Sequence, residues 1–177
     1  MEVRNPVLVV VDMQNGFLNE HSESAIPFVV RLVKECAKRK VPVVFTAFRN
    51  EPDSPFERLI GWDNVRQKPE TDLYEAFQSY AEVLIEKSYY TAFTDEFDSL
   101  LRDRGWMTIL ICGVTTESCV LKTAVDAFER DLVPIVISDA CSSDLGSEMH
   151  RIGLAILEVL IGKKQIMTID ELLAKLN

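Results

Sequence analysis

The stretch TILICGVTTESCVLKTAVDA, residues 108–127, contains the change of pattern that decides the fold. Its first five residues, Thr108–Cys112, form a nearly continuous apolar run, which is typical of a strand buried on both faces of a parallel sheet. After Gly113 and a short polar segment, apolar residues recur at helical spacing from Cys119 to Arg130. This stretch therefore predicts a strand followed by a helix, with Cys119 in or near the first helical turn.

The same alternation of strand and helix recurs along the chain. The other predicted strands are Val7–Val11, Val43–Thr46, Val83–Glu86, Val133–Ile137 and Gln165–Thr168. The other predicted helices are Phe28–Arg39, Asp95–Arg104, Arg151–Ile161 and Asp170–Leu176. The alternation predicts an α/β protein with a three-layer doubly wound fold: a mainly parallel six-stranded sheet with helices on both faces. The longest break, residues 49–72, holds three prolines and many charges, as expected of a functional or disordered loop.

Composition limits the class of protein. A length of 177 residues suits one domain, 1–177, with 47% hydrophobic and 27% charged residues. The net charge of −9 argues against nucleic acid and anionic membranes as partners. No apolar run approaches the roughly 20 residues that span a bilayer. The start of the chain superficially resembles a signal peptide, but its apolar run, Val7–Val11, is short and ends at Asp12, so it fits a first β-strand better. Four scattered cysteines indicate free thiols rather than a disulfide framework or a zinc site, so we expect a cytoplasmic protein.

Three reactive side chains follow predicted strands. Asp12 ends the first strand, Lys87 ends the third, and Cys119 follows the fourth after a short loop. Ligands of doubly wound sheets bind outside the carboxyl ends of the strands. The sequence therefore predicts a carboxylate, an amine and a thiol on one rim of the sheet.

Each of these residues also has a purely structural interpretation. Asp12 fits a turn or a helix cap, and Lys87 fits a solvated strand end. Cys119 fits a small buried apolar residue, but a thiol at a helix N-terminus beside a lysine is expected to have a lowered pKa and to be reactive. The convergence of all three residues favours a site.

The remaining cysteines and histidines carry less information. Cys36 and Cys112 fit helix and strand packing, whereas Cys141 lies in a predicted strand-end loop and is a weaker site candidate than Cys119. His21 lies in an early polar loop. His150 most simply fits a structural, partly buried residue, and we keep it as a weak candidate for substrate contact.

Four segments resemble the isochorismatase-like cysteine hydrolases, which include nicotinamidases and N-carbamoylsarcosine amidases. They are VLVVVDMQNGF (7–17), EKSYYTAF (86–93), GVTTESCVLKTAVDA (113–127) and VPIVISDACSS (133–143), in the family's order. The resemblance covers almost the whole chain and is weakest in the loop 49–72. It implies a catalytic triad of Asp12, Lys87 and Cys119. It also implies a cis peptide between Val114 and Thr115, and an oxyanion hole formed by the backbone N–H groups of Thr115 and Cys119.

The implied activity is hydrolysis of a C–N bond in a small amide or ureide through a covalent thioester. The thiol proton passes to Asp12, Lys87 holds the charges, and the oxyanion hole stabilises the tetrahedral intermediate. Three alternatives stay open: an isochorismate-type enol-ether hydrolase, a non-catalytic family member that acts as a binding or assembly module, and a redox-responsive thiol.

The triad requires no cofactor, and we expect no metal. Nicotinamidases have an Asp and His metal site after the second strand, and the corresponding stretch TAFRNEPDSPF (46–56) contains no histidine. Oligomers are common in the family, which implies a homo-oligomer that acts on a small-molecule substrate. The candidates for substrate binding are Phe17, Phe48, Arg49, Trp62, Tyr89 and Phe93.

Overall fold

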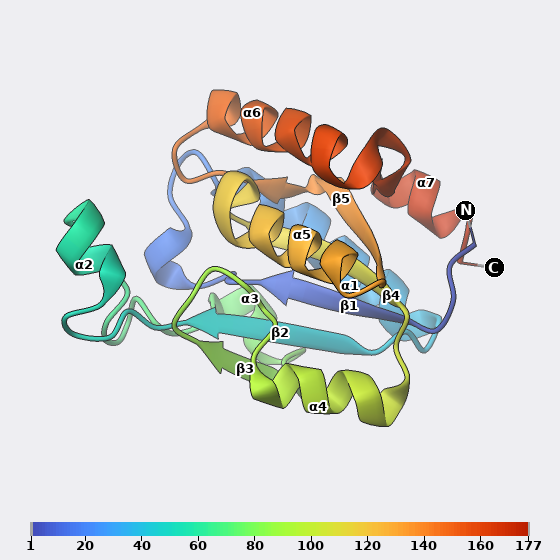
Figure 1. Cartoon of the computed structure of the whole chain (residues 1–177), viewed down its shortest axis with the longest axis horizontal. Coiled ribbons are helices and arrows are strands. Elements are labelled where there is room, and N and C mark those ends of the chain that lie inside the picture. Colours follow the sequence, from blue (N-terminus) through green and yellow to red (C-terminus); the bar gives the residue numbers. More distant parts are fainter. Residues whose placement is uncertain (1, 177) are drawn as a thin grey trace.

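The computed structural model describes residues 2–176 and shows one central sheet between two layers of helices (Figure 1). The six strands are ordered β3-β2-β1-β4-β5-β6, and every neighbouring pair is parallel. The predicted three-layer doubly wound fold is confirmed, with a sheet that is entirely parallel. Within residues 2–176, no helix is both long and apolar enough to cross a membrane.

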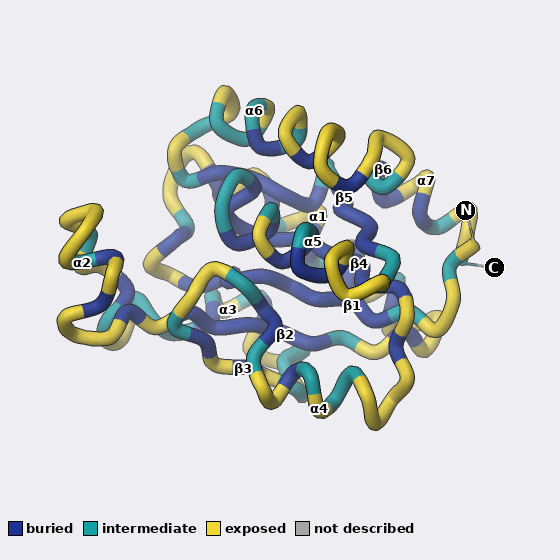
Figure 2. The backbone as a smooth tube through the Cα atoms, viewed as in Figure 1, coloured by how far each residue is buried: buried dark blue, intermediate teal, exposed yellow. Residues whose placement is uncertain are grey.

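The strands occupy the apolar runs of the sequence, with small differences at their ends. They are β1 (Pro6–Val11), β2 (Val43–Phe48), β3 (Leu84–Lys87), β4 (Thr108–Val114), β5 (Val133–Ser142) and β6 (Ile166–Met167). Every residue of β4 is buried, as expected for a central strand covered on both faces. In Figure 2 the central strands are buried, and exposed residues lie on the outward sides of the helices and in the loops. The edge strand β3 also has two exposed residues, Leu84 and Glu86.

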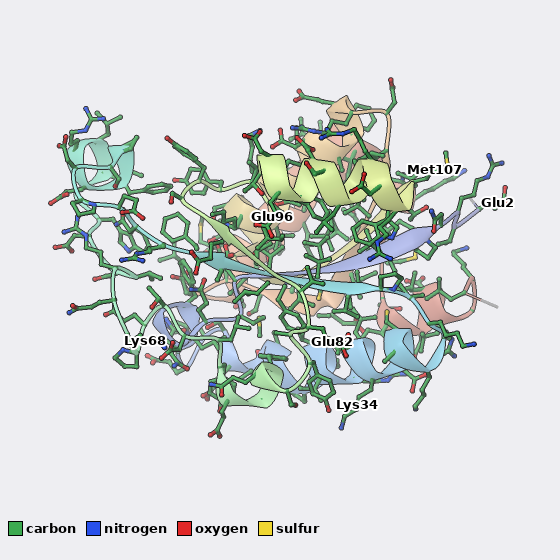
Figure 3. The ribbon with its side chains drawn as sticks, turned by 90° about the horizontal axis from the view of Figure 1, so that it is seen from below. Glu2, Lys34, Lys68, Glu82, Glu96 and Met107 are labelled. Atoms are coloured by element: carbon green, nitrogen blue, oxygen red, sulfur yellow. The ribbon has the colours of Figure 1, made fainter. Side chains whose placement is uncertain are left out.

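The helices divide between the two faces of the sheet. They are α1 (Ile26–Lys38), α2 (Pro55–Ile60), α3 (Glu75–Gln78), α4 (Asp95–Arg104), α5 (Leu121–Glu129), α6 (Ser147–Leu157) and α7 (Ile169–Leu173). Helices α4, α5 and α6 cover one face, and α1, α3 and α7 cover the other (Figures 1 and 3). Glu96 of α4 and Lys34 of α1 therefore lie on opposite sides of the sheet in Figure 3.

Several features differ from the prediction: helix α3 was not predicted, and α6 begins at Ser147 instead of Arg151. Two further differences concern the region 49–72 and strand β5. The region 49–72 contains helix α2, which begins at the Ser54 cap and ends at Gly61 in a left-handed conformation. Strand β5 continues five residues beyond its predicted end, because Cys141 pairs with Gly113 and Ser142 with Val114. Cys141 therefore lies buried in a strand and not in a strand-end loop.

The strand order reverses between β1 and β4, which are neighbours in the centre of the sheet. Strands β2 and β3 extend the sheet from β1 on one side, and β5 and β6 extend it from β4 on the other. Such a switch point opens a crevice at the carboxyl ends of the strands. Asp12 follows β1 and the segment from Thr115 follows β4, so both flank this crevice.

Gly113 lets β1 and β4 approach closely at this point. Its φ of 112° is in a region that favours glycine. A Cβ atom there would lie 2.1 Å from the carbonyl oxygen of Val11. The glycine in GVTTESC is therefore required by the contact between the two strands that flank the crevice.

Candidate active site

A buried ion pair joins Asp12 and Lys87. Asp12 directly follows β1 with a φ of 49°, and Lys87 is the last residue of β3. The Lys87 Nζ lies 2.7 Å from the Asp12 Oδ2, and the two side chains are 1% and 0% exposed. Strand β2 separates β1 from β3, so the long lysine side chain reaches across it to the carboxylate.

Thr46 of β2 fixes the orientation of the Asp12 carboxylate. Its hydroxyl donates to the Asp12 Oδ1 over 2.6 Å and accepts the Asp12 backbone N–H over 3.2 Å. One carboxylate oxygen therefore faces Thr46 and the other faces Lys87. The analysis of the sequence missed Thr46, because a threonine at the end of an apolar strand shows nothing unusual in the sequence.

Cys119 lies beside this pair. It belongs to a short π-helical turn, Thr116–Val120, that leads directly into α5. Its Sγ lies 3.5 Å from the Lys87 Nζ, and the same ammonium group donates to the backbone carbonyls of Tyr89 and Tyr90. The structure thus brings together the carboxylate, amine and thiol that the sequence placed on one rim.

The protonation state of Cys119 differs from the expectation. Burial raises the pKa of the Cys119 thiol to about 12; the charge of Lys87 lowers it, whereas the charge and hydrogen bond of Asp12 raise it. The helix-terminus argument predicted a lowered pKa, and it omitted the complete burial of the sulfur. The resting group is a neutral thiol, so a nucleophilic role requires a base that removes its proton.

The pKa of Lys87 is raised, although burial by itself lowers it. The charges of Asp12 and Cys119, and the hydrogen bonds to both groups, outweigh the burial. Lys87 is therefore a permanent cation between the carboxylate and the sulfur.

The raised pKa of Cys119 predicts slow alkylation of the free protein. A raised pKa favours the neutral thiol, which is a poor nucleophile, so the thiolate is scarce near neutral pH. The rate of iodoacetamide labelling at Cys119, followed by mass spectrometry of the peptide, should rise about tenfold per pH unit from about pH 7 to 9. A rate that levels off near pH 7 would show a low pKa instead.

A cavity of about 400 Å³ opens at Cys119. Aromatic rings make up one wall, which we call the aromatic wall: Phe17, Phe48, Phe56, Trp62 and Tyr90. Phe17 stacks on Trp62 with 6.0 Å between ring centroids, and Phe56 meets Tyr90 edge-on at 5.0 Å. A volume of this size suits a small ligand.

Of the six candidates for substrate binding, the structure places three in this cavity: Phe17, Phe48 and Trp62. Arg49, Tyr89 and Phe93 line a separate hollow. Successive residues of an extended segment point in opposite directions, which separates Phe48 from Arg49. Tyr90 and Phe56 line the cavity in addition, and the sequence analysis did not propose either of them.

The structure contains a cis peptide bond between Val114 and Thr115, at the position that the resemblance implies. The turn that follows is closed by a hydrogen bond from the Val120 N–H to the Thr115 carbonyl over 3.1 Å. The Ser118 N–H also donates to the Thr115 carbonyl, over 3.2 Å. Thr115 precedes the turn at its amino end, where a helix leaves backbone donors without intrahelical partners. Thr115 and Cys119 both line the cavity.

His150 of α6 contacts this turn through a hydrogen bond with Thr116. The Thr116 hydroxyl donates to the carbonyl of Ser142 over 3.0 Å and lies 2.7 Å from the His150 Nδ1. A hydroxyl has one proton, so this geometry makes His150 Nδ1 the donor in the second bond. Burial lowers the pKa of His150, which fits a neutral ring. His150 does not line the cavity and contacts the turn rather than the space for substrate.

Gly153 allows α6 to touch the same turn. A Cβ atom at this position would lie 2.9 Å from the backbone N and Cα atoms of Glu117. Because these are backbone atoms, an added methyl group has to displace the turn or the helix.

Gly153→Ala is therefore expected to destabilise the fold by about 1–3 kcal/mol and to lower turnover at Cys119. Ordinary helix propensity predicts the opposite sign for stability, because alanine is better than glycine in a helix by about 1 kcal/mol. Urea unfolding and steady-state kinetics measure the two effects. Arg151→Ala, at an exposed position of α6, is the matched control and should change neither.

Within residues 2–176, no group of three or more His, Cys, Asp and Glu side chains is arranged to hold a metal ion. Glu51, Asp53 and Glu57, the carboxylates of the loop where related enzymes bind an ion, are engaged elsewhere. Glu57 pairs with Arg66 at 2.6 Å, and Asp53 and Glu51 lie near Arg58 and Arg49.

These features define an α/β protein with a buried Asp–Lys–Cys cluster at the switch point of a parallel sheet. The isochorismatase domain family model matches residues 6–168. The chain therefore belongs to the isochorismatase family.

Amidohydrolases are among its relatives. The chain is 28% identical to the ureidoacrylate amidohydrolase RutB of Pseudomonas savastanoi over 79% of its own length and 71% of that protein. It is 27% identical to the maleamate amidohydrolase of Pseudomonas putida, over 85% of this chain and 78% of that protein. The solved structure of N-carbamoylsarcosine amidase from Thermoplasma acidophilum has a TM-score of 0.81 at 24% identity, covering 96% of this chain and 98% of that one. The last comparison shows the shared fold.

Proposed function

We propose that this chain, as a single domain 1–177, hydrolyses a C–N bond of a small amide or ureide with Cys119 as nucleophile. The observation that supports the proposal is the contact of Lys87 with both Asp12 and Cys119, together with a cavity that Cys119 lines. The amidohydrolases among its relatives support the same reaction class.

The proposed reaction begins with transfer of the Cys119 proton to Asp12. Sulfur then bonds to the substrate carbonyl carbon, and the carbonyl electron pair moves to oxygen. When the carbonyl re-forms, the C–N bond breaks and the Asp12 proton goes to the leaving nitrogen. Water adds to the thioester and releases the acid, and the thiol regains its proton. Lys87 keeps its charge throughout and stabilises the carboxylate and the thiolate in turn.

The raised pKa of Cys119 fits this sequence of steps. A free thiolate in the buried site is unfavourable, so proton removal is best coupled to attack on a bound carbonyl. The backbone N–H groups of Thr115 and Cys119 form the proposed oxyanion hole. Both residues line the cavity, and the proposal assigns their N–H groups to the oxygen on which negative charge develops.

Screening a panel of amides and ureides for ammonia release tests the reaction. Hydrolysis should proceed through a thioester at Cys119. Mass spectrometry detects the acyl group on the peptide that contains Cys119, and hydroxylamine removes this group as a free hydroxamate. Turnover of enol ethers alone would favour the isochorismate-type alternative. Absence of turnover with binding in the cavity would favour the non-catalytic module.

The structure disfavours the redox-responsive alternative, because oxidation requires an exposed thiolate and Cys119 is buried with a raised pKa.

The homo-oligomer and the cytoplasmic location stay predictions of the sequence analysis. Size-exclusion chromatography tests the first, and cell fractionation tests the second.

Hydrolysis is expected to survive exhaustive dialysis against a chelator. The proposed steps use only Asp12, Lys87, Cys119 and backbone donors, and the metal ligands of related enzymes are replaced here by residues without imidazole groups. Activity that disappears on dialysis and returns with one added divalent ion, together with stoichiometric metal in the protein, would contradict the prediction.

A further inference from the structure

Two acidic side chains line the cavity at Cys119 together with the aromatic wall. Glu117 belongs to the same π-helical turn as Cys119, and Asp144 lies in the loop after β5. No lysine, arginine or histidine is among the residues that line this cavity in the described part of the chain. Lys87, the cation that contacts the sulfur, is already paired with Asp12. Within residues 2–176 the cavity is therefore lined by two carboxyl groups and by no cationic side chain.

Glu117 has one oxygen that lacks a partner. Its Oε1 accepts a hydrogen bond from the Ser143 hydroxyl over 2.7 Å. Its Oε2 is buried and has no hydrogen bond within residues 2–176. A buried carboxylate oxygen without a donor is unfavourable, so an N–H group of a ligand that reached this oxygen would be stabilised there.

Asp144 adds a second negative group to the same region. It is half-buried, and burial followed by the charge of Glu117 raises its pKa. Hydrogen bonds from the backbone N–H groups of Asp144 and Leu145 and the charge of His21 lower the pKa, so they offset part of this rise. The backbone carbonyl of Asp144 accepts a hydrogen bond from the Asn19 side chain. A cationic ligand group would relieve the repulsion between the two carboxylates, whereas an anionic group would increase it.

The aromatic wall favours the same ligand charge. Phe17, Phe48, Phe56, Trp62 and Tyr90 place five aromatic rings around the remaining space, and the face of an aromatic ring is electron-rich. Such faces attract organic cations and stack on planar groups. Aromatic rings combined with two carboxyl groups match an organic cation that bears N–H donors.

We propose that the substrate of this site is a small amide or ureide whose body carries a positively charged nitrogen with N–H groups, held by Glu117 and Asp144 against the aromatic wall. This inference rests on the proposed function for its reaction and adds the substrate's charge. It distinguishes the chain from the relatives named for ureidoacrylate and maleamate, because both of those compounds are carboxylates.

Three amides of matched shape test the charge preference: para-(aminomethyl)benzamide, para-(hydroxymethyl)benzamide and para-carbamoylbenzoate, which are cationic, neutral and anionic. The affinity of each amide for the Cys119→Ala variant is measured by calorimetry at a pH of about 8, which is above the usual titration range of histidine. Hydrolysis by the unaltered chain is measured as ammonia release. We expect the cation to bind at least about tenfold more tightly than the neutral amide, and the anion to bind more weakly than either.

Glu117→Gln and Asp144→Asn identify the groups responsible. Each should reduce the ratio of cation to neutral affinity by about tenfold, and Glu117→Gln keeps an oxygen that accepts from Ser143. Asp103→Asn removes the same charge from an exposed position of α4 and should leave the ratio unchanged. A preference for the neutral or anionic amide, or a cation preference that survives both substitutions, would overturn the inference.

The two proposals fail in different ways. Hydrolysis of these amides without cation preference would overturn the inference alone. Cation-selective binding that depends on Glu117 and Asp144, with no hydrolysis of any cationic amide, would overturn the proposed reaction and leave the charge selectivity of the cavity established.

Discussion

Replacing Cys119 with alanine is expected to abolish hydrolysis and leave the fold intact. The substitution removes the only atom that forms a bond to the substrate in the proposed mechanism, so turnover should fall at least about 10⁴-fold. The sulfur lies at a cavity wall, and the ion pair of Asp12 and Lys87 stays complete without it. The midpoint of urea unfolding should therefore change little. Full activity in this variant would refute the role of Cys119 as nucleophile.

Cys112→Ala is the matched control. Cys112 is fully buried in the middle of β4, it does not line the cavity, and burial raises its pKa well above the usual range. Its removal should cost about 1–3 kcal/mol of stability, as expected when a small buried side chain leaves a void. The folded fraction should keep its activity. The two cysteines are seven residues apart, so the comparison separates chemistry from packing.

The sheet was predictable because its signal is local. A strand covered on both faces needs apolar residues at every position, and β1 and β4 show this directly in the sequence. Helix α4 could be placed to the residue, since Thr94 caps its start and Gly105 ends it in a left-handed conformation. The end of β5 was missed because polar Ser138 and Asp139 interrupt the apolar run, whereas pairing with β4 continues beyond them.

The site was predictable only in part. The position of reactive residues at strand ends follows from topology, and the resemblance supplied their grouping. The support from Thr46 and the burial of Cys119 depend on atoms from other elements, which neighbours in the sequence do not reveal. The sign of the Cys119 pKa shift was wrong for this reason: a helix terminus and a lysine are visible in the sequence, whereas loss of water around the sulfur is not.

Lys87→Met is expected to produce the largest combined loss of activity and stability. Lys87 provides the only cation paired with the buried Asp12, and it also donates to the carbonyls of Tyr89 and Tyr90. Methionine has a similar length but leaves the Asp12 carboxylate buried without its counter-ion. Removing one partner of a buried pair costs about 3–5 kcal/mol. Turnover should fall at least about a hundredfold, because neither the carboxylate nor the thiolate is then stabilised.

The double variant Asp12→Asn with Lys87→Met separates the cost of an unpaired charge from the value of the pair. Both charges are then absent, so urea unfolding should show the double variant to be more stable than Lys87→Met alone. Its turnover should be no lower than that of the less active of the two single variants. If Asp12 and Lys87 act as one unit, the first substitution already removes the function of that unit. A double variant whose loss of turnover equals the product of the two single losses would mean that Asp12 and Lys87 act independently. In that case the proton transfer assigned to Asp12 would not depend on the ammonium group of Lys87, and the 2.7 Å contact between them would be structural rather than catalytic.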